Sequence, residues 1–500
     1  MKPFSSATKL KLNTITSILL QIANVICGII LPRLILKQYG SSVNGLISSV
    51  TQFLSLITFL ELGLGAVIPS ALYKPLAENN NDEISAIVTS GSKFFKRIAF
   101  ILLGYVIILM AIYPLFVSRE FDWFFTASLI GVISISSFAQ YYYGIVDRLL
   151  LTADQRGYIQ YSAQIITLVL NTVSCAILIW LGASIHMVKL TTSIIFLIRP
   201  YVLRIYVNNH YQINRNYPYK EEPIKQKWNG IAQHIASVVL GNTDTVVLTV
   251  LSTLSNVSIY TVYNLVLSGV NSLFLSATNG IQSLVGELWA KQRLEDLRNF
   301  FGMVEFLIHT VVVFVFTCAG ILIVPFIQVY TKGVVDADYC QPLFASLLTM
   351  AYAGHCLRLP YNIMILAAGH YKQTQSNYIV AAVLNIIISV FTVWKFGLVG
   401  VAFGTLVAMA YQTVWMAMYD SKNIINWPFT KFLKQIAFDI ISATLIVLAT
   451  SWINLKEKTY ISWVAMGCKV AVIAMVVVSI LSFLFYRNQV KRLVSLVRKK

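Results

Sequence analysis

The sequence predicts an all-α polytopic membrane protein with about fourteen transmembrane helices, each of the roughly 20 residues that a bilayer requires. The 500-residue chain is 57% hydrophobic and 12% charged, and its mean hydropathy is +0.72. A soluble chain carries about 25% charged residues. Apolar stretches separated by short polar gaps fill the chain, so we expect no large soluble domain on either face of the membrane.

The apolar stretches are about 17–31 residues long, which is the length of a membrane-spanning helix. In chain order they cover Ile15–Leu36, Val43–Ile68, Ile98–Val117, Phe121–Val146, Ile159–Leu181, Ile185–Val207, Ile231–Leu254, Ile259–Val285, Phe300–Tyr330, Pro342–Ala368, Tyr378–Trp394, Leu398–Tyr419, Phe432–Ile453 and Ile461–Tyr486.

Basic residues gather in every second gap between the stretches. Of the 38 Lys and Arg, we assign 28 to the chain ends and the even-numbered gaps, 7 to the odd-numbered gaps and 3 to the stretches themselves. This assignment counts four basic residues with a neighbouring gap although the bounds above place them inside a stretch: Lys189, Arg199, Arg204 and Lys434. Cytoplasmic loops of membrane proteins carry the excess of Lys and Arg, so we expect both termini in the cytoplasm. The formal net charge of +18 is spread over short loops. It fits contact with anionic lipid headgroups, and no basic domain indicates nucleic-acid binding.

A polar segment near the middle divides the predicted helices into two groups. We predict an N-terminal lobe of six helices at 1–207, a cytoplasmic linker at 208–227, a C-terminal lobe of six helices at 228–424, an appended helix pair at 425–486 and a basic cytoplasmic tail at 487–500. Residues 39–83 and 254–296 share a short turn, one long helix and a mixed-charge segment. Both copies begin on the same side, which predicts a parallel repeat about an axis along the membrane normal, with a cavity between the lobes.

Motifs for enzymatic chemistry are missing from the predicted loops. The six cysteines are far apart, without the spacing of a zinc site or a disulfide framework. No nucleophile elbow, phosphate-binding glycine loop or carboxylate pair occurs in an exposed segment. We therefore predict a protein that is not an enzyme and has neither a metal site nor a cofactor. H+ and Na+ are the candidate coupling ions.

Short motifs in both halves of the chain can be compared with those of known membrane-protein families. The first half has Pro32, Arg33, Gly40, Gly45 and the run Glu61–Gly65, and the second has Asn242–Leu265 with the pair Ile259-Tyr260, then Leu366–Asn377. Together these motifs resemble the Wzx-type polysaccharide flippases of the MATE-like multidrug/oligosaccharidyl-lipid/polysaccharide (MOP) superfamily. The resemblance extends over most of the chain, and the motifs separate this superfamily from other transporters better than they separate its branches.

The resemblance implies a flippase of the bacterial cytoplasmic membrane. Its substrate would be an isoprenyl (undecaprenyl) pyrophosphate-linked oligosaccharide, moved from the cytoplasmic to the outer leaflet by alternating access during polysaccharide biosynthesis. Membrane lipids, a polysaccharide polymerase and glycosyltransferases are the partners that such a role implies.

Other readings of the chain stay open. A lipid II flippase or a cation-coupled multidrug exporter of the same superfamily fits the same pattern, although lipid II flippases usually carry more cavity arginines in the first lobe than Arg33 alone. A membrane glycan polymerase or ligase fits less well, because it would need a large outer loop with catalytic Arg or His.

Two arginines inside the apolar stretches are the candidate phosphate ligands. A charged side chain at the bilayer centre costs about 2.5–3.5 kcal/mol, so each needs an explanation. Arg358 lies near the middle of its stretch, and Arg33 lies about one turn from the outer end of the first. The planar guanidinium donates two parallel bonds to a phosphate. A structural pair is the alternative for Arg358, and snorkelling to the interface for Arg33.

Three further ionisable residues lie within the stretches. Glu61 and Asp244 occupy comparable places in the two repeats, where they would bind a coupling ion or neutralise an arginine. Lys469, in the last stretch, would line a groove for a lipid tail or pair with another helix. Glu305 and His309, one turn apart, lack further ligands for a metal, and we expect only local helix contacts from them.

Overall fold

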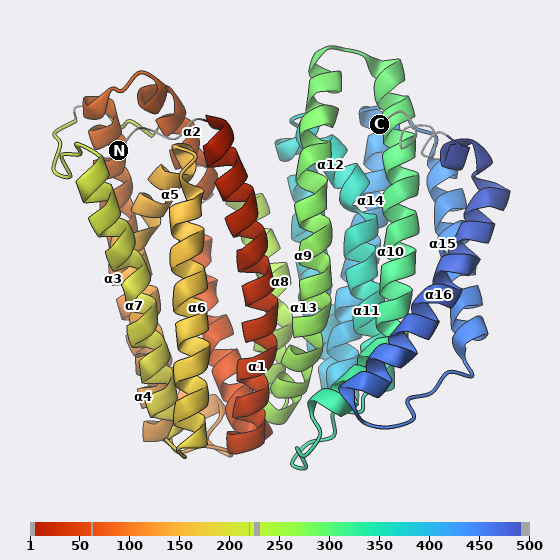
Figure 1. Cartoon of the computed structure of the whole chain (residues 1–500), viewed down its shortest axis with the longest axis horizontal. Coiled ribbons are helices and arrows are strands. Elements are labelled where there is room, and N and C mark those ends of the chain that lie inside the picture. The colour runs from red at the N-terminus through yellow and green to blue at the C-terminus, as the bar shows by residue number, and fades with distance from the viewer. Residues whose placement is uncertain (1–5, 62–63, 220, 225–230, 492–500) are drawn as a thin grey trace. The chain divides into compact units, whose positions relative to one another are not determined.

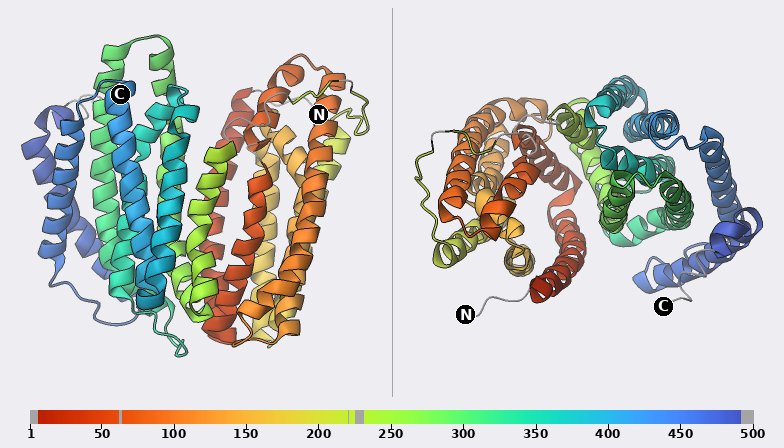
Figure 2. Two further views of the ribbon diagram at one scale, coloured as in Figure 1. Left: turned by 180° about the vertical axis from the view of Figure 1, so that it is seen from behind. Right: turned by 90° about the horizontal axis from the view of Figure 1, so that it is seen from above.

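The computed structural model describes residues 6–61, 64–219, 221–224 and 231–491, and the regular elements among them are all helical. The chain divides into two compact units. Unit 1 contains Met1–Asn242 and Thr253–Ser258, and unit 2 contains Thr243–Ser252 and Ile259–Lys500. Long helices run side by side within each unit (Figures 1 and 2).

Among the described residues, seven α-helices and two short segments of other helical types lie wholly within unit 1. They are α1 (Ser6–Ser55), the 3-10 helix η1 (Leu56–Glu61), α2 (Leu64–Ala77), α3 (Asn81–Phe116), α4 (Trp123–Ala139), the π-helix η2 (Gln140–Gly144), α5 (Ile145–Ala153), α6 (Gly157–Trp180) and α7 (Ile185–His210). Helix α1 packs against α6, α6 against α7, and α4 against both α3 and α7.

Unit 2 contains the remaining helices, and α8 and α9 each begin in unit 1. They are α8 (Ile231–Leu251), α9 (Leu254–Ala290), α10 (Leu294–Tyr330), α11 (Pro342–Leu357), α12 (Leu359–Ala367), α13 (Tyr371–Phe396), α14 (Leu398–Asn423), α15 (Phe429–Thr450) and α16 (Tyr460–Phe485). Helix α14 packs against α11 and α13, and α10 packs against α11, α15 and α16.

The helices confirm the predicted all-α membrane fold. Eleven segments of the described residues are long and apolar enough to cross a membrane. The first of them, Lys11–Glu61, contains two consecutive spans, because Gly40 leaves helical geometry with φ 85° and turns the chain within α1. The shorter helix α8 and the pair α11–α12 supply the other spans of a set of about fourteen.

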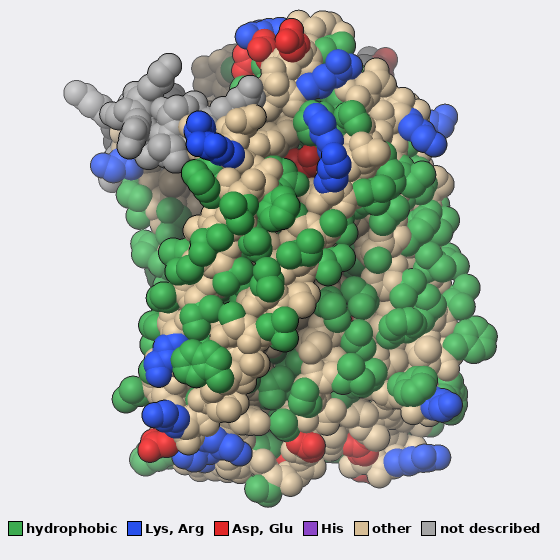
Figure 3. Space-filling view, turned by 90° about the vertical axis from the view of Figure 1, so that its right-hand side faces the viewer, with side chains coloured by type: hydrophobic (Ala, Val, Ile, Leu, Met, Phe, Trp, Pro, Cys, Tyr) green, Lys and Arg blue, Asp and Glu red, His purple; other side chains and the backbone are tan. Residues whose placement is uncertain are grey.

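The surface of the protein matches a lipid environment. Figure 3 shows a broad band of hydrophobic side chains on the face that includes α15 and α16, with Lys and Arg gathered toward its two ends. On α16, Met466, Val470, Ala474 and Val478 are buried against unit 2. Large apolar side chains elsewhere on this helix, such as Ile461, are exposed. Such exposure is stable only where lipid covers the surface.

Candidate functional site

Arg358 lies at a break between two helices of unit 2. Helix α11 ends at Leu357 and α12 begins at Leu359, and Pro360, which has no N–H, prevents one continuous helix. The Arg358 side chain is only 7% exposed. Its Nε has no hydrogen-bond partner, and its Nη1 lies 3.9 Å from the Met409 sulfur. No carboxylate of the described residues forms an ion pair with Arg358, so this buried cation has no compensating negative charge among them.

Arg33, the other predicted phosphate ligand, lies in α1 of unit 1 and is half-buried. It follows Pro32, which is contained within the helix. The two arginines therefore belong to different units, and each is described by its own surroundings.

Glu61 ends the 3-10 helix η1 and is also half-buried. Its Oε1 accepts a hydrogen bond of 2.6 Å from the Tyr141 hydroxyl of η2. It also lines a cavity in unit 1. The next two residues of its motif, Leu62 and Gly63, lie outside the described residues.

Asp244 is the centre of a buried hydrogen-bonding cluster in unit 2. Its carboxylate, 4% exposed, accepts from the Thr405 hydroxyl at 2.7 Å, the Tyr260 hydroxyl at 3.0 Å and Asn385 Nδ2 at 3.3 Å. Asn385 Oδ1 and Ser389 Oγ, one turn apart on α13, are buried without a partner. A carboxylate with unpartnered amide and hydroxyl oxygens is a donor set that suits a hard monovalent cation or a proton.

Sequence reasoning pointed to Asp244 but not to its partners. Asn385 and Thr405 are 141 and 161 residues away in the chain. The available signal was the set of polar side chains at helical spacing inside apolar stretches, which ordinary interhelical hydrogen bonds also produce.

Lys469 is exposed on α16. An apolar groove of about 640 Å³ does exist in unit 2, but the residues that line it come from α10, α11 and α15, and Lys469 is not among them.

A second buried polar network joins three helices of unit 2 and the connection between α14 and α15. His309 Nδ1 lies 2.6 Å from Asp439 Oδ2, and the Tyr361 hydroxyl donates to Glu305 Oε1 at 2.7 Å. Trp427 Nε1 donates to the other Glu305 oxygen at 3.0 Å. The expectation of local helix contacts for Glu305 and His309 was wrong, because α12, α15 and the connection between α14 and α15 bring partners from outside α10.

Asp420, on α14, lies beside this network. It is 1% exposed, both its carboxylate oxygens are without a hydrogen-bond partner in the described part of the chain, and it interacts electrostatically with Glu305. A buried carboxylate without a hydrogen-bond partner is costly, so Asp420 is a polar group whose place in this network the described contacts do not stabilise.

Unit 1 contains two adjoining cavities of about 570 and 290 Å³, each lined by both apolar and polar side chains. The larger is lined by Lys189 and Glu61, the smaller by Arg148 and Arg199, and both by Gln140. The charge count places these three basic residues in loops, and this assignment was wrong. Arg148 lies in α5, which continues past the predicted end of its stretch at Val146. Lys189 and Arg199 lie in α7, within the bounds predicted for the stretch Ile185–Val207, so counting them with the gaps was inconsistent with those bounds.

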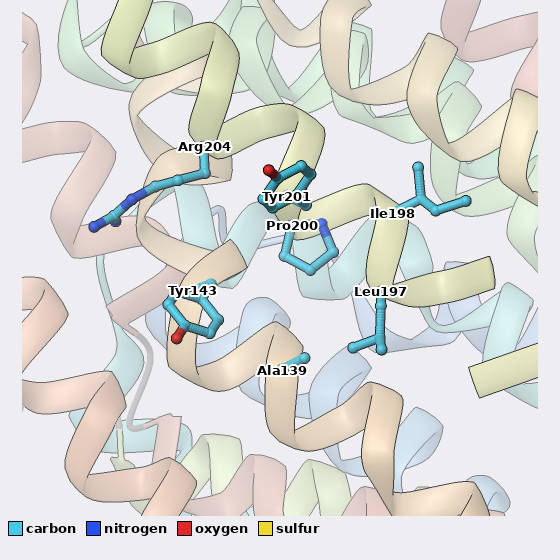
Figure 4. A pocket seen from close by; sticks show the side chains of 7 residues that line it. All are labelled: Ala139, Tyr143, Leu197, Ile198, Pro200, Tyr201 and Arg204. Carbon is cyan, nitrogen blue, oxygen red and sulfur yellow. The ribbon is translucent and has the colours of Figure 1, made fainter. Parts of the chain in front are cut away.

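A third hollow of about 540 Å³ lies between α7 and the α4–η2 segment (Figure 4). Tyr143 and Tyr201 line it and are 50% and 68% exposed, and Arg204 also lines it. The Arg204 guanidinium pairs with Asp147 at 3.5 Å, and Arg215 pairs with the same carboxylate at 2.9 Å. Asp147 is fully buried, so it is a structural ion-pair acceptor and not a solvated helix-end charge.

Comparison with known proteins gives a likeness of fold. No family model and no curated protein matches the sequence. Among solved structures, the lipid II flippase MurJ in an inward closed conformation matches with a TM-score of 0.70 and 14% identity, over 96% of this chain and 99% of that one.

Two MATE transporter structures also match. An inward-facing multidrug resistance MATE family transporter of the MOP superfamily has a TM-score of 0.56 and 16% identity, over 80% of this chain and 94% of its own. The eukaryotic MATE transporter AtDTX14 has a TM-score of 0.56 and 12% identity, over 87% and 99%. The chain therefore shares its fold with these solved transporters.

Proposed function

We propose that this protein is a flippase that moves an isoprenyl pyrophosphate-linked oligosaccharide from the cytoplasmic to the outer leaflet by alternating access. Arg358 is the observation that carries this proposal. A guanidinium that is buried in a membrane-spanning region without a carboxylate partner is expensive, and a transported phosphate would neutralise it.

The extent of the structural likeness supports a flippase over a drug exporter. The match to the lipid II flippase includes 96% of this chain, whereas the two MATE structures cover 80% and 87%. A chain of about fourteen spans has helices beyond two six-helix lobes, and these would offer surface to a long isoprenyl tail. Under this proposal Lys469 and the apolar groove between α10, α11 and α15 belong to the tail-binding side of the protein.

We assign ion coupling to Asp244. Three side chains donate hydrogen bonds to the Asp244 carboxylate. H+ or Na+ would bind to this carboxylate in place of one or more of these bonds, and the unpartnered oxygens of Asn385 and Ser389 would be further ligands. Glu61, which has one hydroxyl donor, is the second candidate for coupling or for charge pairing with an arginine.

The proposed cellular setting is the bacterial cytoplasmic membrane, with both termini in the cytoplasm. One end of unit 1 supports this orientation. Lys9 and Arg156, which the charge pattern assigns to the cytoplasmic side, both pair with Asp154 there, at 3.2 and 2.7 Å. Glycosyltransferases would supply the substrate, and a polysaccharide polymerase would consume it.

The test is leaflet transfer in proteoliposomes. A fluorescent isoprenyl-pyrophosphate disaccharide is reconstituted with the protein, and the outer-leaflet fraction is followed with a membrane-impermeant quencher. We expect transfer by the wild type, and a reduction of roughly 10–100-fold in the Arg358→Ala and Arg33→Ala variants, the value of a charge-assisted hydrogen bond. Arg293→Ala is the control, because this exposed arginine pairs only with Asp296 at the surface.

The same assay separates the alternatives. Transfer of lipid II but not of the disaccharide lipid would assign the lipid II role. Efflux of a cationic dye without lipid transfer would assign a drug exporter. If both arginine variants transfer the lipid at the wild-type rate, the assignment of the phosphate ligands is wrong.

A further inference from the structure

The smaller cavity of unit 1 has an unusual balance of charge. It lies between the α4–η2–α5 segment, α6 and α7, and its polar lining includes Arg148, Arg199, Gln140, Gln160 and Gln164. All five side chains can donate hydrogen bonds, and two carry a fixed positive charge.

The two guanidiniums are not neutralised within unit 1. Arg199 Nε donates to Thr167 Oγ1 at 2.5 Å, and the guanidinium carbon lies 4.0 Å from the centre of the Phe196 ring. These contacts orient the group but bring no negative charge. In the described part of the chain neither arginine forms an ion pair, and Asp147, the neighbour of Arg148, is already engaged by Arg204 and Arg215.

A buried amide in the same cavity also lacks a partner. Gln160 is 9% exposed, and its Oε1 has no hydrogen-bond partner in the described structure. An amide can rotate to present its NH2 group in place of its oxygen. Gln160 is therefore ready to donate to an acceptor that the protein itself does not provide.

The backbone around the cavity is irregular where the donors meet. Helices α4 and α5 are joined by the π-helix η2, and its first residue, Gln140, lines both cavities of unit 1. Such π-helical turns occur often at functional sites. At the other end of η2, a Cβ on Gly144 would lie 2.9 Å from Pro200 Cβ, so tight packing closes this side of the cavity. The larger cavity adjoins on the side of Gln140, and Lys189 and Glu61 are among its lining residues.

We propose that unit 1 binds a phosphate-class oxyanion between Arg148 and Arg199. Each guanidinium presents a planar fork that matches the oxygens of a phosphate, and Gln140 and Gln160 complete the donor set. The same chemistry belongs to a free diphosphate and to the headgroup of an anionic lipid. The site is separate from Arg33 and Arg358, and the inference holds whether or not the protein flips an oligosaccharide lipid.

The experiment is calorimetric titration of the purified full-length protein with inorganic pyrophosphate. We expect the wild type to bind and the Arg148→Gln, Arg199→Gln double variant to bind at least roughly tenfold more weakly, because two charge-assisted contacts are lost. Arg204→Gln removes the same charge from α7, but this side chain faces Asp147, and we expect the wild-type affinity. Absence of binding by the wild type, or equal binding by the double variant, would overturn the proposal.

Two further arms keep the result specific. The Arg33→Ala, Arg358→Ala double variant should still bind pyrophosphate at the cavity of unit 1, and loss of all binding in this variant alone would contradict the proposal. If the arginine double variant does not fold, as judged by its thermal transition, Gln160→Leu and Arg199→Lys replace it, and both should weaken binding.

The source of the anion is tested in nanodiscs. Competition with pyrophosphate by phosphatidylglycerol, compared with phosphatidylcholine, would identify a lipid headgroup as the occupant. Undiminished pyrophosphate binding in both lipids would identify a free phosphate species, and either result supports the site.

Discussion

His309 Nδ1 on α10 lies 2.6 Å from Asp439 Oδ2 on α15, 130 residues later in the chain. The pair is buried, and the second oxygen of Asp439 accepts from Gln435 at 3.1 Å. This buried polar contact holds α15, the first helix of the predicted appended pair, against α10. Polar contacts of this kind are costly to break, because the partner left behind is buried and unpaired.

Replacing Asp439 by Ala should therefore destabilise unit 2. We expect the free energy of unfolding to fall by about 2–4 kcal/mol, because His309 and Gln435 lose their acceptor. The measurement is unfolding in mixed detergent micelles, followed by tryptophan fluorescence. Asp296→Ala, at an exposed ion pair, should cost less than about 1 kcal/mol. Equal stability of the two variants would show that the buried pair contributes nothing.

Arg358→Lys tests whether geometry or charge matters at the break between α11 and α12. A lysine keeps the positive charge but presents a point charge in place of a planar fork. If the site binds a phosphate, leaflet transfer should fall roughly tenfold, less than in Arg358→Ala. Transfer at the wild-type rate in the lysine variant would mean that only the charge is used.

Asp244→Asn tests the coupling assignment. The amide keeps the size of the side chain and removes its charge, so an ion gradient should no longer accelerate transfer, while uncoupled transfer along the substrate's own gradient persists. Thr405→Val, which removes the donor at 2.7 Å, should weaken the dependence on the ion several-fold. The assay is transfer with imposed Na+ or pH gradients. A variant that still responds fully to both gradients would move coupling away from Asp244.

Gly45 is a site where unit 1 tolerates no side chain. A Cβ there would lie 1.8 Å from the carbonyl oxygen of Leu254, which belongs to the same unit. Gly45→Ala should therefore destabilise the protein by about 1–3 kcal/mol, through displaced backbone. Gly104→Ala is the matched control, because nothing lies within 4 Å of its added methyl group. The two thermal midpoints should differ by several degrees, and identical midpoints would contradict the close approach.

Asp154 holds the end of unit 1 together outside the membrane-spanning segments. It accepts from Lys9, Arg156 and the Tyr211 hydroxyl, the last at 2.5 Å. Burial and the bond to Asp154 raise the pKa of Tyr211, so the phenol stays neutral and donates over the physiological range. Asp154→Asn should lower the free energy of unfolding by about 1–2 kcal/mol, since two cations lose their partner. Proteolysis of the connection between α5 and α6 should also become faster, and an unchanged digestion rate would show that the cluster does not restrain it.

The sequence by itself determined the fold class and the number of spans. Long apolar runs can exist in a bilayer only as helices, because the helix pairs its own backbone groups and no water is present to do so. The same runs did not fix the ends of the helices: α3 begins at Asn81, well before the predicted Ile98, and α5 continues past the predicted end at Val146, so that Arg148 lies within a helix. A helix can continue beyond its apolar run because polar and charged residues are tolerated where it meets water or a cavity.

Only the tertiary structure decided which polar groups meet. Asp244 was visible as a carboxylate inside an apolar stretch, whereas its contacts with Asn385 and Thr405 depend on how α8, α13 and α14 pack. The same holds for His309 with Asp439, and for the shared cavity of Arg148 and Arg199. Side chains more than a hundred residues apart are brought together by helix packing, and that packing depends on the shape of many apolar surfaces at once, which a pattern of hydrophobicity does not record.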